Sequence, residues 1–404
     1  MSWFHPFRLI TPAADKSHLV ASRSYVSYGK AELRDKLERN PYSYLHVIHP
    51  SGTGTPSAKR GTEGFYQLVR EQYDLFKERG WLQSWEEPRV AIYRQSTETH
   101  SCTGIVGTLS AAGIASGKLK LHEQTLKKRE RIFTKYLRVV GCHAEPILCS
   151  FPDQNKQGQA LSHFISGKTI EQASMDFSTT DRIRHTIWIL DSKSSRLAAQ
   201  LLNDIDALYL ADGHHRVASS LALAEEHPLD DAKQRVLSFA IPESQLVIKG
   251  YHREMSDIHW DREQWEQALA TLPEGTSVET LAEDGLAPSS TGIIHLHTKV
   301  GHWRISLPKN HTEVDADFLQ TQMLRPFFQV TDPRNDIRLR YIPGTGSRDG
   351  LLKRIDDQED RCIFELHPVT SEQIKTTADR GGFLPPKSTW IEPKLRSGLF
   401  IYEL

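Results

Sequence analysis

The chain has 404 residues, of which 38% are hydrophobic and 25% charged, a composition typical of a globular protein with two or three domains. Fifty basic and 51 acidic residues give a net charge of −1, so no overall charge favours nucleic acid or an anionic membrane. No apolar run approaches the ~18 residues of a membrane-spanning helix, and the N-terminus does not resemble a signal peptide. Four cysteines without C-x-x-C spacing are expected to be reduced thiols: Cys102, Cys142, Cys149 and Cys362. We therefore expect a cytoplasmic protein that binds neither membranes nor nucleic acid.

Short β-branched or aromatic segments alternate with longer amphipathic ones along the chain. The predicted strands are 43–48, 88–94, 103–109, 185–190, 207–210 and 292–297, and the predicted helices are 63–80 and 126–140. A Gly/Ser/Thr-rich run at 51–64 predicts a loop, either a surface connection or a lid. The alternation predicts a mixed α/β (α+β) fold. A polar shift near 254–263 predicts an N-terminal α/β region at 1–255 and a C-terminal α/β domain at 256–404 that ends in the PPKST loop.

The sequence ADGHHR (211–216) joins the strand at 207–210 to a predicted helix that begins near Val217. A strand, a glycine turn and a helix N-terminus point backbone N–H groups at an anion, and Arg216 can bind phosphate with two hydrogen bonds. Asp212 is suited to hold Mg2+, to orient a histidine or to cap the loop. The alternatives are a plain turn with surface histidines and a two-histidine metal site, although H-x-x-x-H spacing is absent. The loop thus favours a phosphate site.

A second polar segment, HEQT (122–125), precedes the basic start of the helix at 126–140. Lys127, Lys128, Arg129 and Arg131 lie there, although the helix dipole disfavours cations at this end. Either an anion binds nearby or the cations form a solvated surface. Glu123 is a candidate general base, or an acidic residue favoured by the dipole.

The segments HEQT, EPILC (145–149) and ADGHHR, in this order, resemble ParB-like nucleotide-dependent proteins and the free serine kinases among them. The resemblance implies a ParB/sulfiredoxin-like nucleotide-binding core at about 88–255, embedded in a larger mixed-sheet protein. About sixty residues between EPILC and ADGHHR depart from the pattern and predict a remodelled pocket. ParB-like sulfiredoxins have a cysteine where His214 stands, so reductase chemistry is not expected.

The same resemblance assigns roles to individual residues. It implies that Glu123 activates a substrate hydroxyl, with His122 as the other candidate catalytic residue. The implied phosphate-binding residues are Asp212, Gly213, His214, His215 and Arg216.

Landmarks along nearly the whole chain are similar to the conserved family called domain of unknown function 1015. They include PFR (6–8), TGIVG (103–107), HTIWIL (185–190), ADGHHR and PPKSTWIEPKLRSGL (385–399). The segment 21–32 departs from the family. Membership implies a shared fold and does not supply a reaction.

The C-terminal PPKST loop places a cation and two hydroxyls after two stiff prolines, and the following EPKLRSG segment adds Lys394, Arg396 and Ser397. Such a loop is suited to clamp a phosphate or a carboxylate, or forms only a rigid turn before the terminal strand. Further candidates for substrate or phosphate contacts are Thr125, His185, Lys387, Ser388, Thr389 and Lys394.

These observations predict a small-molecule phosphotransferase that uses ATP or ADP, with Mg2+, to phosphorylate the hydroxyl of a serine-like or hydroxy-acid metabolite. The alternative is a ParB-like nucleotide-binding protein or nucleotidase without an acceptor. A homo-oligomer is compatible with either.

Overall fold

The computed structural model describes residues 2–50, 58–282, 286–358 and 360–404 and divides into two compact units. Unit 1 comprises Met1–Leu121, Thr125–Leu246 and Pro393–Leu404, and unit 2 comprises His122–Gln124 and Val247–Glu392. Half of the loop predicted at 51–64, residues 51–57, lies outside the described residues. In the described ranges, none of the helices combines the length and apolar character needed to cross a membrane.

The boundaries of the units differ from the predicted division at 255/256. Strand β14 (Tyr251–Met255) pairs with β18 (Leu339–Pro343) and β19 (Cys362–Leu366), so the chain enters unit 2 before residue 255. The last residues return to unit 1, where β21 (Tyr402–Glu403) pairs with β7 (Cys142–His143). Both boundaries are set by strand pairing between segments that are distant in sequence. The composition of the chain does not indicate such pairing.

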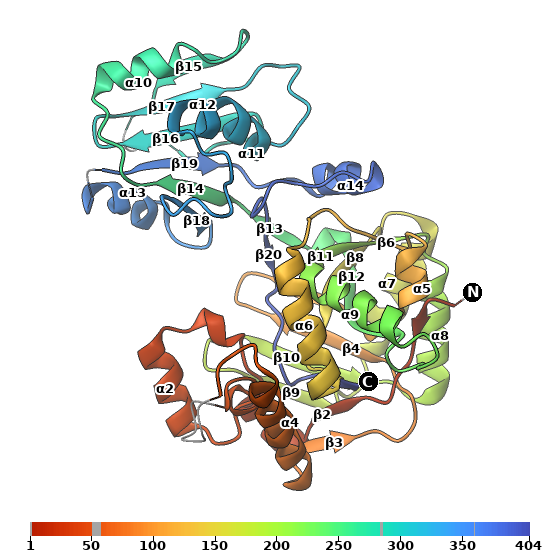
Figure 1. Ribbon diagram of the computed structural model, residues 1–404. Coiled ribbons are helices and arrows are strands. Elements are labelled where there is room, and N and C mark those ends of the chain that lie inside the picture. Colours follow the sequence, from red (N-terminus) through yellow and green to blue (C-terminus); the bar gives the residue numbers. More distant parts are fainter. Residues whose placement is uncertain (1, 51–57, 283–285, 359) are drawn as a thin grey trace. The chain divides into compact units, whose positions relative to one another are not determined.

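The described part of unit 1 contains a mixed sheet of nine strands, in the order β6-β11-β8-β12-β5-β4-β10-β9, with β1 also paired to β5 (Figure 1). Two of its pairings, β11 with β6 and β12 with β8, are parallel. The strands are β1 (Phe4–His5), β4 (Ala91–Ser96), β5 (Ser101–Ser110), β6 (Leu119–Lys120), β8 (Ile147–Phe151), β9 (Met175–Ser178), β10 (Arg184–Ile189), β11 (Leu208–Asp212) and β12 (Arg235–Pro242). Strands β2 (Ile10–Pro12) and β3 (Leu82–Ser84) pair separately.

The buried hydrophobic residues of this unit form two clusters, to which the apolar faces of its helices contribute. Helix α4 directs Phe65, Val69, Tyr73 and Phe76 into one of them, as its helical spacing predicts. The helices are α1 (Ser17–Val20), α2 (Lys30–Arg39), α3 (Leu45–Ile48), α4 (Glu63–Glu78), α5 (Ala111–Ala115), α6 (Lys127–Val140), α7 (Lys156–Lys168), α8 (Ser192–Asn203) and α9 (His214–Glu226). Short 3-10 helices occur at η1 (Ala14–Lys16), η2 (Tyr25–Ser27) and η4 (Glu243–Gln245).

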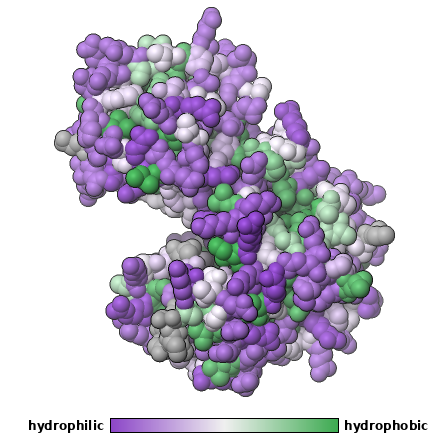
Figure 2. All heavy atoms as spheres, in the orientation of Figure 1, coloured by the Kyte–Doolittle hydropathy of each residue, from purple (hydrophilic) through white to green (hydrophobic). Residues whose placement is uncertain are grey.

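The described part of unit 2 contains a six-stranded antiparallel sheet in the order β15-β17-β16-β19-β14-β18. The other strands of this sheet are β15 (Ser277–Thr280), β16 (Ile293–Thr298) and β17 (Gly301–Ser306). Strands β13 (Val247–Lys249) and β20 (Trp390–Glu392) pair separately. Its helices are α10 (Arg262–Leu269), α11 (Asp315–Phe318), the π-helix η5 (Leu319–Leu324), α12 (Arg325–Phe328), α13 (Arg348–Asp356) and α14 (Ser371–Asp379). Figure 2 shows mainly hydrophilic side chains on the visible face of each unit.

The structure confirms the predicted mixed α/β fold and all but one of the predicted elements. The strand predicted at 43–48 is wrong, because this segment contains helix α3. Leu45 and Val47 are both buried there. A short apolar run does not distinguish a buried strand from one buried helical turn.

Candidate functional site

Asp212 ends strand β11 and Gly213 caps helix α9, so the predicted strand, turn and helix all form. Gly213 has φ +108°, and a Cβ added there would lie 2.9 Å from Ile147 Cγ2 and from Arg216 Nε. Both the backbone angle and the crowding require glycine. Helix α9 begins at His214 rather than near Val217, so both histidines lie in its first turn. The N-terminal N–H groups of such a helix lack intrahelical acceptors and favour an anion.

Arg216 forms an ion pair with Glu145, a residue of the EPILC segment. Ser397 Oγ donates to the other Glu145 oxygen, Oε2, at 3.0 Å. Burial lowers the pKa of Arg216 to about 10, which leaves the guanidinium charged at neutral pH. Arg216 is therefore a cation held beside the glycine turn by a carboxylate.

The other acid of the loop, Asp212, also has a cation beside it. Lys394 Nζ lies 3.1 Å from Asp212 Oδ2, and both side chains are about two-fifths exposed, at 42% and 40%. Because water screens such a pair, it costs little to separate. Asp212 and Lys394 are thus accessible to a ligand of either charge.

Helix α6 packs against helix α9, and Figure 1 shows the two helices side by side. His214 is buried, and the His215 ring stacks on Phe133 of α6 with ring centroids 6.5 Å apart. Thr125 donates a hydrogen bond to Glu130, which, with Lys127 and the charge of His215, lowers the pKa of that carboxyl. The cations Lys127, Lys128, Arg129 and Arg131 are all exposed.

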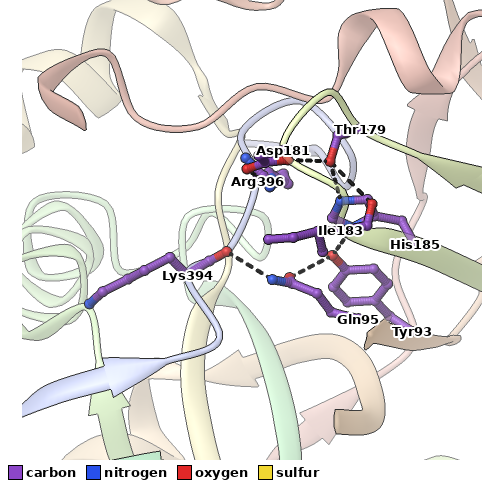
Figure 3. A network of polar contacts seen from close by, with 8 residues as sticks. All are labelled: Tyr93, Gln95, Thr179, Asp181, Ile183, His185, Lys394 and Arg396. Atoms are coloured by element: carbon purple, nitrogen blue, oxygen red, sulfur yellow. Dashed lines mark hydrogen bonds and ion pairs between the residues drawn. The ribbon is translucent and has the colours of Figure 1, made fainter. Parts of the chain in front are cut away.

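His185 is buried and belongs to a polar network of the same unit (Figure 3). Its Nδ1 is 2.6 Å from the Tyr93 hydroxyl, and its Nε2 is 3.3 Å from Thr179 Oγ1. Thr179 donates to Asp181 at 2.6 Å, and Asp181 accepts from Arg396 at 2.6 Å. Burial, with the charge of Arg396, lowers the pKa of His185 to about 3, so the ring is neutral at pH 7.

Residues 394–397 connect this network to the glycine turn. The Lys394 carbonyl accepts from Gln95 Nε2 at 3.4 Å, while its ammonium pairs with Asp212. Arg396 reaches Asp181, and Ser397 reaches Glu145. The sequence singled out Lys394, Arg396 and Ser397 for contacts with phosphate or a substrate carboxylate, but it missed Glu145 and Asp181. Glu145 had one signal, its place in the EPILC segment of the ParB-like resemblance, whereas Asp181 had none.

The remaining candidates belong to unit 2. His122 is buried, and its carbonyl accepts from the Leu384 N–H at 2.8 Å. Glu123 is partly buried. In the PPKST loop, Ser388 Oγ donates to the Pro385 carbonyl at 2.7 Å, and Lys387 Nζ lies 5.8 Å from the Tyr251 ring centre.

The predicted site residues are therefore divided between the units. Unit 1 holds residues 212–216, Thr125, His185 and Lys394, whereas unit 2 holds His122, Glu123 and residues 387–389.

The fold and the site define a two-unit mixed α/β protein with a strand–glycine–helix turn flanked by an arginine and a lysine. The family described as "Protein of unknown function (DUF1015)" matches residues 4–326. The chain belongs to this family, as the landmarks predicted. No curated protein matches the sequence.

Several solved structures are similar to this chain. A mutant free serine kinase in complex with ADP has 13% identity and a TM-score of 0.39, over 72% of this chain and 91% of that one. A C-terminally truncated SbnI from Staphylococcus aureus has 13% identity and a TM-score of 0.39, over 73% and 85%. A conserved hypothetical protein from Pyrococcus furiosus has 13% identity and a TM-score of 0.35, over 74% and 94%. Similarity at this level assigns neither a ligand nor a reaction.

Proposed function

We propose that the protein is a nucleotide-dependent phosphotransferase whose phosphate site consists of residues 212–216 and Lys394. The observation that carries this proposal is the turn at Gly213, where a helix N-terminus and two cations, Arg216 and Lys394, come together. Backbone N–H groups at a helix start bind anions, and arginine binds phosphate with two parallel hydrogen bonds. The nucleotide is ATP or ADP, and the acceptor is a hydroxyl of a serine-like or hydroxy-acid metabolite.

Phosphate binding at this turn exchanges one set of charge pairs for another. Arg216 leaves Glu145 for a phosphate oxygen, and Lys394 leaves Asp212 for another. Ser397 and its hydrogen bond remain available to Glu145. The freed Asp212 carboxylate is a hard oxygen ligand, which suits Mg2+. Magnesium supplies charge neutralisation of the phosphates when bound.

The reaction transfers one phosphoryl group. The acceptor oxygen bonds to the terminal phosphorus, the bond from that phosphorus to the leaving diphosphate or monophosphate breaks, and the hydroxyl proton passes to a base. Glu123 is our candidate for this base, on the family resemblance alone, with His122 beside it in sequence. The basic residues of the turn stabilise the charge on the transferred group.

The test measures ATP and ADP binding by the full chain, and phosphorylated product from a panel of hydroxylated metabolites. Arg216→Ala is expected to lower nucleotide affinity by about 10- to 100-fold, since a hydrogen bond to a charged group contributes about 1.5–3 kcal/mol. Lys394→Ala is expected to weaken it less. Glu123→Gln is expected to abolish product and leave binding intact.

Arg138→Ala is a matched control, because Arg138 pairs with Glu226 at the far end of α9, at 2.6 Å. It removes an arginine–glutamate pair from the same unit and is expected to leave binding unchanged. Absence of nucleotide binding, or equal effects of Arg216→Ala and Arg138→Ala, would contradict the phosphate site.

The second candidate function is nucleotide hydrolysis, or nucleotide binding without an acceptor, which the same turn supports. Nucleotide loss without phosphorylated metabolite would favour it. We also propose a small-molecule substrate, a cytoplasmic location and no nucleic-acid partner. Size-exclusion chromatography with light scattering tests for a homo-oligomer.

A further inference from the structure

The two faces of the unit 2 sheet differ in chemistry. Along β16, Ile294 and Leu296 point into the hydrophobic core, so the alternating His295 and His297 share the opposite face. On β19, Phe364 belongs to the same core, and Glu365 lies on the histidine face. Three polar residues thus share one face of two neighbouring strands.

Strand register brings these three residues together. His295 is the direct cross-strand partner of Glu365 in the antiparallel pair of β16 and β19. Glu365 Oε2 lies 3.0 Å from His297 Nε2 and 3.9 Å from His295 Nδ1. Ile363 of this face packs on Leu351 and Ile355 of α13, so the helix covers the face. The three side chains are 5% exposed or less.

Their spacing matches the coordination of one metal ion. One ligand atom from each residue lies within 4.8 Å of the others, and among the described residues no other such His/Cys/Asp/Glu group occurs. Metal–ligand bonds of about 2.1 Å to zinc place tetrahedral ligand atoms about 3.4 Å apart. The two measured distances lie on either side of this value. Two imidazoles and one carboxylate are a ligand set that zinc takes.

One ligand atom in the cluster lacks a hydrogen bond. His295 Nδ1 is buried and has no hydrogen-bond partner, an arrangement that costs free energy unless the atom binds something else.

The residues around the cluster resemble the outer shell of metal sites. His302 Nδ1 lies 3.1 Å from His297 Nδ1, the ring nitrogen that faces away from Glu365. Arg348 Nε lies 3.3 Å from Glu365 Oε2. Such partners fix the ring orientation and hold the carboxylate of a metal site. Glu365 also lines an open pocket of about 550 Å³, together with His252, Arg348 and Arg354, which provides an entry path.

We propose that His295, His297 and Glu365 form a binding site for one divalent metal ion of the zinc class. Three protein ligands leave a fourth position for water or a ligand, as in catalytic rather than structural zinc sites. The pocket beside Glu365 gives that position access to solvent. This site is independent of the phosphate site proposed for unit 1.

The experiment uses the full chain, freed of metal by a chelator and then titrated with Zn2+ and separately with Co2+. One ion of either metal is expected per chain, with cobalt absorption bands of a low-coordinate nitrogen and oxygen site. Zn2+ is also expected to raise Tm, because an ion that binds only the folded state stabilises it.

Substitutions distinguish the proposed metal ligands from the residues that only contact those ligands. His295→Asn and Glu365→Gln are each expected to lower Zn2+ affinity by more than the ~100-fold limit typical of outer-shell changes, and His302→Ala by about 10- to 100-fold. His259→Asn is the control, since His259 is 76% exposed in the same unit, and is expected to change nothing.

The proposal is overturned if the wild-type chain shows no saturable Zn2+ or Co2+ binding, or binds Mg2+ in their place. It is also overturned if folded His295→Asn and Glu365→Gln bind Zn2+ as the wild type does. Should both variants fail to fold, the cobalt spectrum of the wild type decides, because a surface site would give the spectrum of an octahedral aqua ion.

Discussion

The glycine turn of unit 1 and the histidine face of unit 2 both place cations beside carboxylates, but in different surroundings. At the turn, Glu145 is 30% exposed and Asp212 is 40% exposed. On the histidine face, Glu365 is 4% exposed, and Glu254 of β14 is fully buried. Glu254 accepts from Arg354 Nε at 2.6 Å and from Arg361 Nη1 at 2.9 Å.

This difference in exposure determines how easily a ligand can replace the charge pairs of each region. Water screens the pair of Asp212 and Lys394, whose side chains are both about two-fifths exposed, so a ligand can replace this pair at small cost. On the histidine face Glu254 and Glu365 are 4% exposed or less, so losing one partner leaves the other buried and unpaired. The turn is therefore suited to reversible binding of an anion, and the histidine face to holding one ion tightly.

The largest expected difference in stability is between substitutions of Glu254, which is fully buried, and Glu145, which is 30% exposed. Glu254→Gln is expected to lower the free energy of unfolding by about 3–5 kcal/mol, because Arg361 loses its buried partner. Glu145→Gln is expected to cost about 1 kcal/mol. Urea unfolding of both variants measures this contrast, and a larger cost for Glu145→Gln would reverse it.

Substitution of Gly213 tests whether the turn requires glycine because of crowding as well as backbone angle. Gly213→Ala is expected to cost about 3 kcal/mol, because the alanine meets both a disfavoured φ and the Ile147 side chain. Gly117→Ala is the control, with φ +83° and nothing within 4 Å of the added carbon, and is expected to cost about 1 kcal/mol. Similar thermal unfolding of the two variants would show that crowding at Gly213 is unimportant.

Acid is expected to destabilise unit 1 through His185. Its folded pKa of about 3 lies below the ordinary 6.5, so between these values the unfolded chain binds a proton that the folded chain does not. Stability from this residue is intact above pH 6.5 and falls by about 1.4 kcal/mol per pH unit below it, or about 2 kcal/mol by pH 5.

The measurement compares urea midpoints at pH 7 and pH 5. His185→Gln is expected to flatten the dependence. His163→Gln, at an exposed position of α7 in the same unit, is expected to leave it unchanged. An unaltered slope in His185→Gln would assign the acid sensitivity to other groups.

The smallest effect is expected for Arg138→Ala. Its pair with Glu226 is exposed on both sides, at 48% and 40%, so the loss is expected to stay below about 1 kcal/mol. Thermal unfolding measures it, and a cost comparable to that of Gly213→Ala would contradict the screening argument.

Local patterns predicted much of the fold. The spacing of Phe65, Val69, Tyr73 and Phe76 predicted α4, and the β-branched runs at 88–94, 185–190 and 292–297 lie on β4, β10 and β16. The segment 43–48 was mispredicted because one buried helical turn has the same composition as a strand. The start of α9 was placed three residues late, since His214 and His215 interrupt the apolar pattern that marks a helix.

The glycine turn was predicted from contiguous residues, but the contacts of Glu145 with Arg216 and Ser397 were not. Glu145 and Ser397 lie 71 and 181 residues from Arg216, and no local pattern relates them. The histidine face escaped prediction for the same reason. H-x-H on a strand becomes a cluster only when the register sets Glu365 opposite His295.

The sequence by itself determined the family, the mixed α/β character and the strand–glycine–helix turn, because each depends on residues close together in the chain or on motifs in a fixed order. Only the tertiary structure decided that the chain's end returns to unit 1 and that unit 2 gathers two histidines and a glutamate. Both depend on strand pairing between distant segments, whose free energy comes from burying whole sheet faces rather than from any local preference.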